Sequence, residues 1–260
     1  MDRRAQMINW LGMYTLFIKE VWRFLKVTIQ TILTPVVTSL LYLLVFGQAL
    51  EEHVEVFDGV NYLHFLIPGL MMMNIITNSF ANSSSSLIQS KMNGNLIFVL
   101  LAPLSVLEIF LAFTAAALLR GIMVGFVVYL AVSPFIQLPI HSPMMVVAFA
   151  LLGSASLGAM GIIGGIWAEN YDQHAGFQNF IILPLSFLSG VFYSLNSLPE
   201  LWQTVSHFNP FFYMVDGFRY GFFGQSDADP QLNLLICSLF LLFLAFISLS
   251  MLHKGYKIRR

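Results

Sequence analysis

Charged residues are scarce in this sequence. Asp, Glu, Lys and Arg make up 10% of its 260 residues, whereas hydrophobic residues make up 58%. Soluble domains carry about 25% charged residues, so the composition excludes an ordinary soluble protein and predicts one membrane domain over residues 1–260. The net charge of −1 indicates no nucleic-acid partner, because proteins that bind nucleic acids present strongly basic surfaces.

Cysteine and the common catalytic motifs are also missing. Cys237 is the single cysteine, which excludes a disulfide framework and a thiolate metal cluster. His64 and His141 have no second ligand at the spacing of a metal site. The dipeptide Gly-Lys never occurs, so a phosphate-binding loop of the GxxxxGKS type is excluded. Neither Ser154 nor Ser156 has the flanking glycines of a nucleophile elbow. We predict no catalytic residue, metal or cofactor in this chain, and expect another chain to supply the energy for any transport.

Long apolar runs are abundant. About 20 mostly apolar residues suffice to cross a bilayer as a helix. Six such windows occur, at residues 28–50, 62–87, 105–132, 143–167, 177–197 and 231–252. The sequence therefore predicts an all-α membrane protein with six transmembrane helices. The two halves show no internal repeat, which disfavours an ion-coupled carrier built from inverted repeats.

The basic residues predict the orientation of these helices. Cytoplasmic loops of membrane proteins carry an excess of Lys and Arg. Residues 51–59 contain four acids and no Lys or Arg, whereas the segments before the first window, between the second and third, and after the last are basic. We therefore predict that both termini are cytoplasmic and that residues 253–260 form a basic cytoplasmic tail. The residues that carry this prediction are Arg3, Arg4, Lys19, Arg23, Lys26, Lys91, Lys254, Lys257, Arg259 and Arg260.

The segment before the first window, within residues 1–27, has the pattern of an amphipathic helix. In "WLGMYTLFIKEVWRFLK", residues 10–26, apolar side chains recur every three or four residues, and Lys19, Arg23 and Lys26 fall on the other side. This pattern is typical of a helix that lies in the membrane interface with its basic face toward lipid phosphates. A functional elbow and a plain topological anchor both remain open.

A few polar residues lie inside the predicted spans. Arg120 is about 18 Å along its helix from Glu108, at a depth where a charge costs about 2.5–3.5 kcal/mol. It should therefore face protein or water, either as a residue of a transport path or as a structural hydrogen-bonding centre. Asn74, Asn78 and Asn82 share one helix face and are expected to form hydrogen bonds between helices.

The fourth window carries a stripe of small residues. Ser154, Gly158, Gly161 and Gly165 recur at intervals of four, three and four residues. Small side chains allow a second helix to approach closely within a membrane. We therefore predict that this stripe packs against neighbouring helices of the same chain.

The order of these segments resembles the ABC-2 type permeases, the membrane subunits of ATP-driven exporters. The resemblance covers essentially the whole chain and rests on "FLIPGLMMMNIITNSFANSSSSL" (residues 65–87) and "LPLSFLSGVFYSLNSLPELWQTVSHFNPFFYMVDGFRYGFFG" (residues 183–224). These stretches are most similar to those of the YadH group of bacterial inner-membrane permeases. The resemblance implies a homodimer in the inner membrane that exports a drug, lipid or lipid-linked glycan. Two copies of a separate ATPase, which bind ATP and Mg, would drive the export.

The resemblance also implies where a closing element, here called the gate, would lie. Members of the family fold short re-entrant helices between spans five and six, which here fall in residues 198–228. Pro199 suits the first turn of one such helix, while Asn209 and Pro210 suit the cap and first position of the next. Asp216 and Arg219 lie three residues apart and could pair. With Trp202, these residues form the predicted gate. A plain aromatic belt at the membrane surface is the alternative.

Two further sites are implied by the same resemblance. The transport path is expected along spans one, two and five, lined by Phe180, Phe187, Phe192 and Tyr193 together with Arg120. The loop between spans two and three is expected to hold a coupling helix that contacts the ATPase, with a second contact in the loop before span five. The residues assigned to coupling are Lys91, Asn93, Gly94, Asn95, Pro103, Glu169 and Asp172.

Two other functions remain open. A membrane scaffold that assembles other proteins would need no transport path. A small ion-coupled carrier would need charged side chains inside the spans, and these are rare here. A neighbouring ATPase gene would distinguish the permease from the scaffold.

Overall fold

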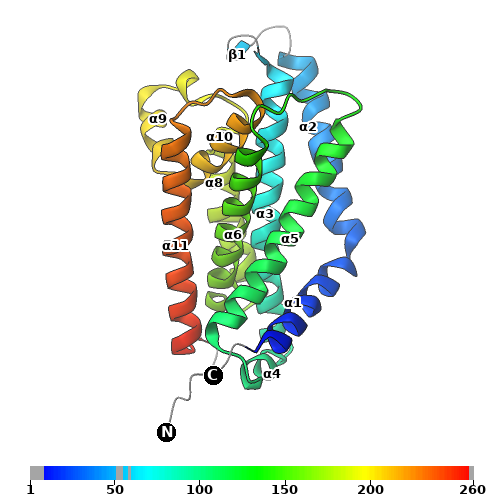
Figure 1. The fold of residues 1–260 in the computed structure, drawn as a ribbon, viewed down its shortest axis with the longest axis vertical. Helices are drawn as coiled ribbons and strands as arrows, with labels where there is room; N and C mark the ends of the chain where they lie inside the picture. Colours follow the sequence, from blue (N-terminus) through cyan, green and yellow to red (C-terminus); the bar gives the residue numbers. More distant parts are fainter. Residues whose placement is uncertain (1–8, 51–54, 58–59, 258–260) are drawn as a thin grey trace.

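The computed structural model describes residues 9–50, 55–57 and 60–257. These residues form a bundle of helices, most of which run along its long axis (Figure 1). Arg3, Arg4, Arg259 and Arg260, which contributed to the predicted orientation, lie outside the described residues, as does most of the acidic segment 51–59. The expected all-α architecture is confirmed, apart from one short antiparallel pair of strands.

The elements follow one another along the chain in this order: α1 (Trp10–Leu25), the π-helix η1 (Ile29–Leu33), α2 (Thr34–Leu50), β1 (Glu55–Phe57), β2 (Val60–Asn61), α3 (Tyr62–Met92), α4 (Leu96–Leu101), α5 (Val106–Val132), α6 (Pro143–Trp167), α7 (Tyr171–Phe177), the π-helix η2 (Gln178–Ile182), α8 (Leu183–Phe187), the 3₁₀-helix η3 (Leu195–Ser197), α9 (Glu200–His207), α10 (Pro210–Phe223) and α11 (Pro230–Lys254).

Among the described residues, five helices are long and apolar enough to cross a membrane. They are Ile29–Gly47, which joins η1 to α2, and the helices α3, α5, α6 and α11. In Figure 1, α1 and α4 lie at one end of the bundle, and β1 and α9 lie at the opposite end. The shorter α10 is inserted among the long helices and contacts α3, α6 and α11.

The fifth predicted window, 177–197, differs from the structure. Its helical part begins earlier, at Tyr171, and passes through α7, η2 and α8 before it ends at Phe187. Ser189 then donates its hydroxyl to the Ser186 carbonyl at 2.6 Å, and Gly190 adopts a left-handed backbone with φ of +75°. These local bonds turn the chain where a continuous helix was expected.

The core is built around α3. Phe65, Leu66, Met72, Ile76 and Phe80 of this helix are all buried. They belong to a cluster that also includes residues of α5, α6, α10 and α11. Helix α3 contacts α2, α5, α6 and α10, whereas α11 packs on α6 and α10 (Figure 1).

The small-residue stripe of α6 lies against α3 and α5. A Cβ atom added at Gly161 would lie 2.5 Å from the Phe80 carbonyl oxygen, and one added at Gly165 would lie 2.7 Å from the Leu87 Cβ. Glycine at these two positions therefore lets the backbones of α3 and α6 approach more closely than any side chain would permit.

Helix α1 is amphipathic, but one predicted contact is wrong. Its buried face consists of Leu16, Glu20 and Phe24. The Arg23 side chain points inward and donates to Glu20 at 3.0 Å and to the Asn82 carbonyl oxygen at 2.6 Å. Arg23 therefore does not face lipid phosphates as expected, because the buried Glu20 carboxylate needs a cationic partner.

Candidate functional site

An aromatic cluster joins α2 to the turn that follows α8. Phe192 has ring-centroid distances of 5.4 Å to Tyr42, 5.5 Å to Phe46 and 5.6 Å to Phe187. The structure thus brings Phe187 and Phe192, both predicted to line the path, next to two residues of α2. Phe187 is half-exposed, at 38%, so the cluster presents an apolar surface on this side of the bundle.

The other residues assigned to the path lie outside this cluster. Phe180, in η2, is exposed and makes none of the ring contacts described above. Tyr193 lies beside the cluster, and its hydroxyl donates to the Phe187 carbonyl oxygen at 3.4 Å. Arg120 projects from α5 toward α3, where it donates to the Asn78 side chain at 3.2 Å.

The three asparagines of α3 connect it to three different helices. Asn74 donates to Ser39 of α2 at 2.9 Å, Asn78 accepts from Arg120 of α5, and Asn82 accepts from Arg23 of α1. The expectation that these side chains form hydrogen bonds between helices is confirmed. Arg120 and Arg23 thus contact side chains that lie one turn apart on α3.

The predicted gate segment forms two short helices. Pro199 precedes α9, and the half-exposed Trp202 lies in its first turn. Asn209 caps α10 by accepting from the Phe211 amide at 3.0 Å and also donates to the Leu185 carbonyl oxygen at 2.7 Å. Pro210 is the first residue of α10, as its fixed φ and missing N–H favour. Asn209 therefore ties the start of α10 to α8.

Asp216 and Arg219 are both completely buried in α10, yet they are not an ion pair. Asp216 accepts from the Asp227 and Ala228 amides at 2.8 and 3.0 Å and from the Asn233 side chain at 2.9 Å. These bonds fix the chain that leads into α11. The expected pairing of Asp216 with Arg219 is therefore replaced by separate partners.

Arg219 connects α10 to two other parts of the bundle. It donates to the Gly190 carbonyl oxygen at 2.8 Å. Its guanidinium also lies 3.7 Å above the centre of the Phe65 ring of α3, a favourable cation–π geometry. Arg219 therefore holds the turn after α8 and the start of α3 against α10.

At the opposite end of the bundle, α4 is a short helix with an exposed apolar side. Asn93 and the left-handed Gly94 end α3, and Asn95 starts α4. Pro103 follows α4, and its carbonyl oxygen accepts from Asn9 at 3.1 Å. The large apolar residues exposed on α4 are Ile97, Phe98 and Leu101, at 55%, 70% and 75%.

The ends of α3, α6 and α11 meet close to α4. Lys91 donates to the Ile166 and Ala168 carbonyl oxygens at 2.7 and 2.8 Å, so it ties α3 to the end of α6. Glu169 pairs with Lys257 at 2.9 Å. Asp172 is exposed in the first turn of α7.

Helix α7 also carries a partly buried histidine. The Nε2 atom of His174 lies 2.9 Å from the Ser84 hydroxyl of α3. Burial lowers the pKa of this imidazole, which favours its neutral form.

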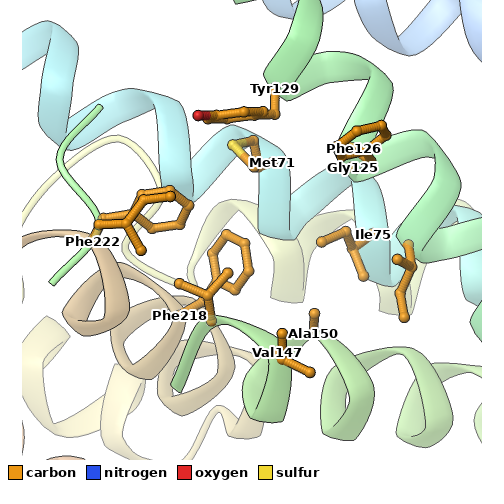
Figure 2. Close-up of a pocket in the computed structure, with 12 residues that line it drawn as sticks. Met71, Ile75, Gly125, Phe126, Tyr129, Val147, Ala150, Phe218 and Phe222 are labelled. Carbon is orange, nitrogen blue, oxygen red and sulfur yellow. The ribbon is translucent and has the colours of Figure 1, made fainter. Parts of the chain in front are cut away.

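A groove lies between α3, α5, α6 and α10 (Figure 2). Its volume is about 320 Å³. Figure 2 shows apolar side chains from all four helices at its walls. The lining residues are Met71, Ile75, Ile122, Gly125, Phe126, Tyr129, Ile140, Val146, Val147, Ala150, Phe218 and Phe222.

A second pocket adjoins this groove and is lined by both polar and apolar residues. Its volume is about 510 Å³, and it shares Ile140 and Phe222 with the groove. Its polar lining residues are Asn61, His64, His141 and Gln225. Sequence analysis left the two histidines separate, whereas the fold places them in one pocket. In the part of the chain that the structure describes, no group of three or more His, Cys, Asp or Glu residues could hold a metal ion.

Sequence reasoning missed the roles of Tyr42 and Phe46 in the aromatic cluster, and it missed that His64 and His141 line the same pocket. Tyr42 and Phe46 lie four residues apart on a helix that is apolar all round, so their spacing did not distinguish them from residues that face lipid. His64 and His141 are far apart in the sequence, and no local signal could have brought them together.

Comparison with known proteins identifies the family. The ABC-2 type transporter model matches residues 12–223. The inner membrane transport permease YadH of Escherichia coli (strain K12) is 33% identical over 97% of this chain and 98% of its own length. Nodulation protein J of Rhizobium leguminosarum bv. viciae is 24% identical over 95% of each chain. The matched region includes the aromatic cluster, α4 and all of α10, and the chain therefore belongs to the ABC-2 type transporter family.

Proposed function

We propose that this chain exports a hydrophobic or amphipathic substrate, such as a drug, a lipid or a lipid-linked glycan, along a path at the interface of a homodimer. As a member of the ABC-2 family, it is the transmembrane permease subunit of an ABC transporter. ATP hydrolysis in such transporters belongs to a separate ATPase subunit. The proposal adds the class of substrate, the direction of transport, the homodimer and two copies of the ATPase.

The proposed topology has six crossings in a bacterial inner membrane, the location that the name of YadH gives for that relative. Five crossings are the long apolar helices. The sixth uses η2, α8 and the turn after them, which is short for a full crossing and leaves α9 and α10 as re-entrant helices at the outer side. Both termini are then cytoplasmic, and α1 lies in the inner interface as an elbow.

The exposed apolar side of α4 is the observation that carries the proposal. In this topology α4 faces the cytoplasm, because it joins α3 to α5 at the same end as α1 (Figure 1). Contiguous apolar side chains that face water mark a protein-binding surface. Ile97, Phe98 and Leu101 therefore suit docking to the ATPase, with Asn93, Gly94, Asn95 and Pro103 setting the direction of α4.

A second contact with the ATPase is proposed at the start of α7. Asp172 is exposed there, so it is available to a partner. Lys91 and Glu169 lie behind this surface, where they join α3, α6 and the segment after α11. If the ATPase moved α4 or the start of α7, the bonds of Lys91 and Glu169 would transmit that movement to α3 and α6.

The proposed path runs along the aromatic cluster. Phe187, Phe192 and Tyr193 offer an apolar surface with one hydroxyl, which suits an amphipathic cargo. The exposed Phe180 extends this surface along η2. Arg120 contacts Asn78 of α3, one turn from the Asn82 that Arg23 of α1 contacts, so the cargo would meet it nearer the cytoplasmic end.

The gate is proposed at α9 and α10. Asn209 and Arg219 fasten α10 to Leu185 and Gly190, which lie on either side of Phe187. Pro199 and Trp202 place α9 beyond them, at the outer end. A shift of the turn after α8 would therefore displace α10 directly.

Purification of the tagged chain from its native membranes, followed by mass spectrometry, tests the proposal. We expect a nucleotide-binding subunit in stoichiometric amounts. Phe98→Asp should lower its recovery at least about tenfold, because central apolar residues dominate most interfaces. Leu201→Asp is the matched control, since Leu201 is equally exposed, at 70%, on α9 at the other end. Repeated absence of the subunit from folded, dimeric protein would overturn the permease proposal in favour of a scaffold.

A further inference from the structure

We propose that the groove and the adjoining polar pocket together bind one membrane phospholipid, with an acyl chain in the groove and the phosphate group in the pocket. This site is separate from the proposed path, because none of Tyr42, Phe46, Phe187 and Phe192 lines it. The inference does not depend on the proposed export function.

The shape and lining of the groove suit an acyl chain. The volume of about 320 Å³ is many times the roughly 10–15 Å³ that a single water molecule needs in a cavity, so the groove has room for a segment of an acyl chain. Among the described residues that line the groove, the Tyr129 hydroxyl is the one side-chain oxygen. A polar ligand would lose its hydrogen bonds to water there without replacement.

The opening of the groove faces the hydrocarbon of the membrane. Phe126 of α5 and Val147 of α6 line it and are exposed, at 57% and 56%. Both belong to helices that are long and apolar enough to cross a membrane. The chains of neighbouring lipids are therefore the apolar groups nearest to the opening.

The adjoining pocket supplies what a phosphate group requires. His64, His141, Asn61 and Gln225 carry side chains that can donate hydrogen bonds. Ile140 and Phe222 line both cavities, so a ligand can extend from one into the other. An apolar cavity that continues into a polar one selects an amphipathic molecule over a purely apolar or a purely polar one.

The position of His141 is fixed before any ligand arrives. Its amide donates to the Phe222 carbonyl oxygen at 3.1 Å, and the Ser142 amide donates to that of Gly221 at 2.8 Å. The imidazole also lies edge-on to the Tyr220 ring, with centroids 5.8 Å apart. A side chain that is already held in place loses little entropy on binding.

The lipid site also contacts α10, which belongs to the proposed gate. Phe218 and Phe222 of α10 form part of the groove (Figure 2), and Phe218 precedes Arg219. A bound acyl chain would therefore support the face of α10 that lines the groove. Loss of the lipid should loosen α10 without altering the aromatic cluster.

Photo-crosslinking tests the acyl-chain site. The full chain is reconstituted in vesicles of phosphatidylethanolamine in which a fraction of the lipid carries a diazirine on one acyl chain. After irradiation, we expect labelled peptides to include residues 122–129 and 218–222. Val147→Trp, at the opening, should lower this labelling about tenfold, the effect of excluding roughly two methylene groups. Leu239→Trp on α11 is the matched control, because Leu239 has the same exposure of 56%.

Equal labelling of Val147→Trp and Leu239→Trp, or labelling spread evenly over exposed faces of α5 and α11, would overturn the acyl-chain site. Ala150→Phe, which fills the groove from its wall, repeats the test independently of Val147. A variant counts only if its thermal unfolding matches that of the wild type.

The phosphate part has its own test. The double variant His64→Ala/His141→Ala is labelled with the same phospholipid and with a diacylglycerol that carries the identical diazirine chain. We expect severalfold weaker labelling by the phospholipid and unchanged labelling by the diacylglycerol. Equal effects on both probes would remove the phosphate group from the inference. Neither test contains an ATPase, so failure here would leave the permease proposal to be decided by its own experiment.

Discussion

At the scale of single residues, α10 shows how a buried charge can organise the structure around it. Arg219 is fully buried, contacts the Gly190 carbonyl oxygen and stacks on Phe65. Asp216, one turn earlier, fastens the chain before α11. Two residues of one short helix therefore connect α3, the turn after α8 and α11.

Replacement of Arg219 should be costly. Arg219→Met removes the charge-assisted hydrogen bond to the Gly190 carbonyl oxygen and the cation–π contact with Phe65, and we expect a loss of about 2–4 kcal/mol in the free energy of unfolding. Arg219→Lys keeps the charge but loses the planar stacking on Phe65, so its loss should be smaller. Thermal unfolding in detergent measures both. If Arg219→Met were as stable as the wild type, these contacts would not be balancing the buried charge.

The spacing of Asp216 and Arg219 predicted a contact that the fold does not make. Residues three apart on a helix are close enough to pair, and sequence reasoning could go no further. The partners that the structure supplies, Gly190, Asp227 and Asn233, come from segments whose approach to α10 depends on the whole bundle. By contrast, the cap of α10 was predictable, because Asn209 and Pro210 act on their own helix.

At the scale of elements, the packing of α6 on α3 depends on glycine. The Phe80 carbonyl oxygen of α3 would lie 2.5 Å from a Cβ atom at Gly161, and a backbone atom cannot move aside as a flexible side chain can. The stripe was visible in the sequence because its spacing is local. The sequence did not show that the stripe would contact α3 and α5.

A matched pair of alanine substitutions tests this packing. Gly161→Ala should lower the free energy of unfolding by about 1–3 kcal/mol, the usual cost of overpacking. Gly176→Ala, in α7, has no atom within 4 Å of the added Cβ, and it should be neutral or slightly stabilising because alanine favours helices. Thermal unfolding of the two variants decides. Equal midpoints would mean that α3 and α6 can move apart freely.

The predicted fifth span marks the limit of hydropathy as a signal. Residues 177–197 are apolar enough to suggest one helix, yet the helix ends at Phe187. The turn is made by serine hydroxyls that bond to backbone carbonyls and by the left-handed Gly190. An average over about 20 residues cannot register such single bonds, which is why composition predicted a span and the structure contains a bend.

At the scale of the whole molecule, one side of the bundle remains exposed and aromatic. Phe180 is 83% exposed. Phe187 lies on the same helical segment and stacks on Phe192, which contacts Tyr42 of α2. The proposed homodimer would place this side against its equivalent in a second copy. Isologous contacts of this kind are the commonest route to a symmetric dimer.

Cysteine cross-linking in membranes tests this arrangement. Cys237, which is buried, is first replaced by Ser, and single cysteines are introduced as Phe180→Cys and Phe246→Cys. We expect an oxidant to cross-link the Phe180→Cys chains into covalent dimers in high yield. Phe246 on α11 is also well exposed, at 71%, and the Phe246→Cys chains should remain monomers on gels. Similar yields from both variants would argue against a dimer through η2.

The polar face of α3 has a consequence for how the chain enters the membrane. Asn74, Asn78 and Asn82 find their partners on α2, α5 and α1, and α5 is synthesised after α3. The Asn78 side chain donates to the Asn74 carbonyl oxygen of its own helix, but when α3 first leaves the ribosome the Asn78 side-chain oxygen still lacks its donor, Arg120 of α5. Stable insertion of α3 should therefore wait until α5 has been made. The central helix α3 would then insert later than α2, which precedes it in the chain.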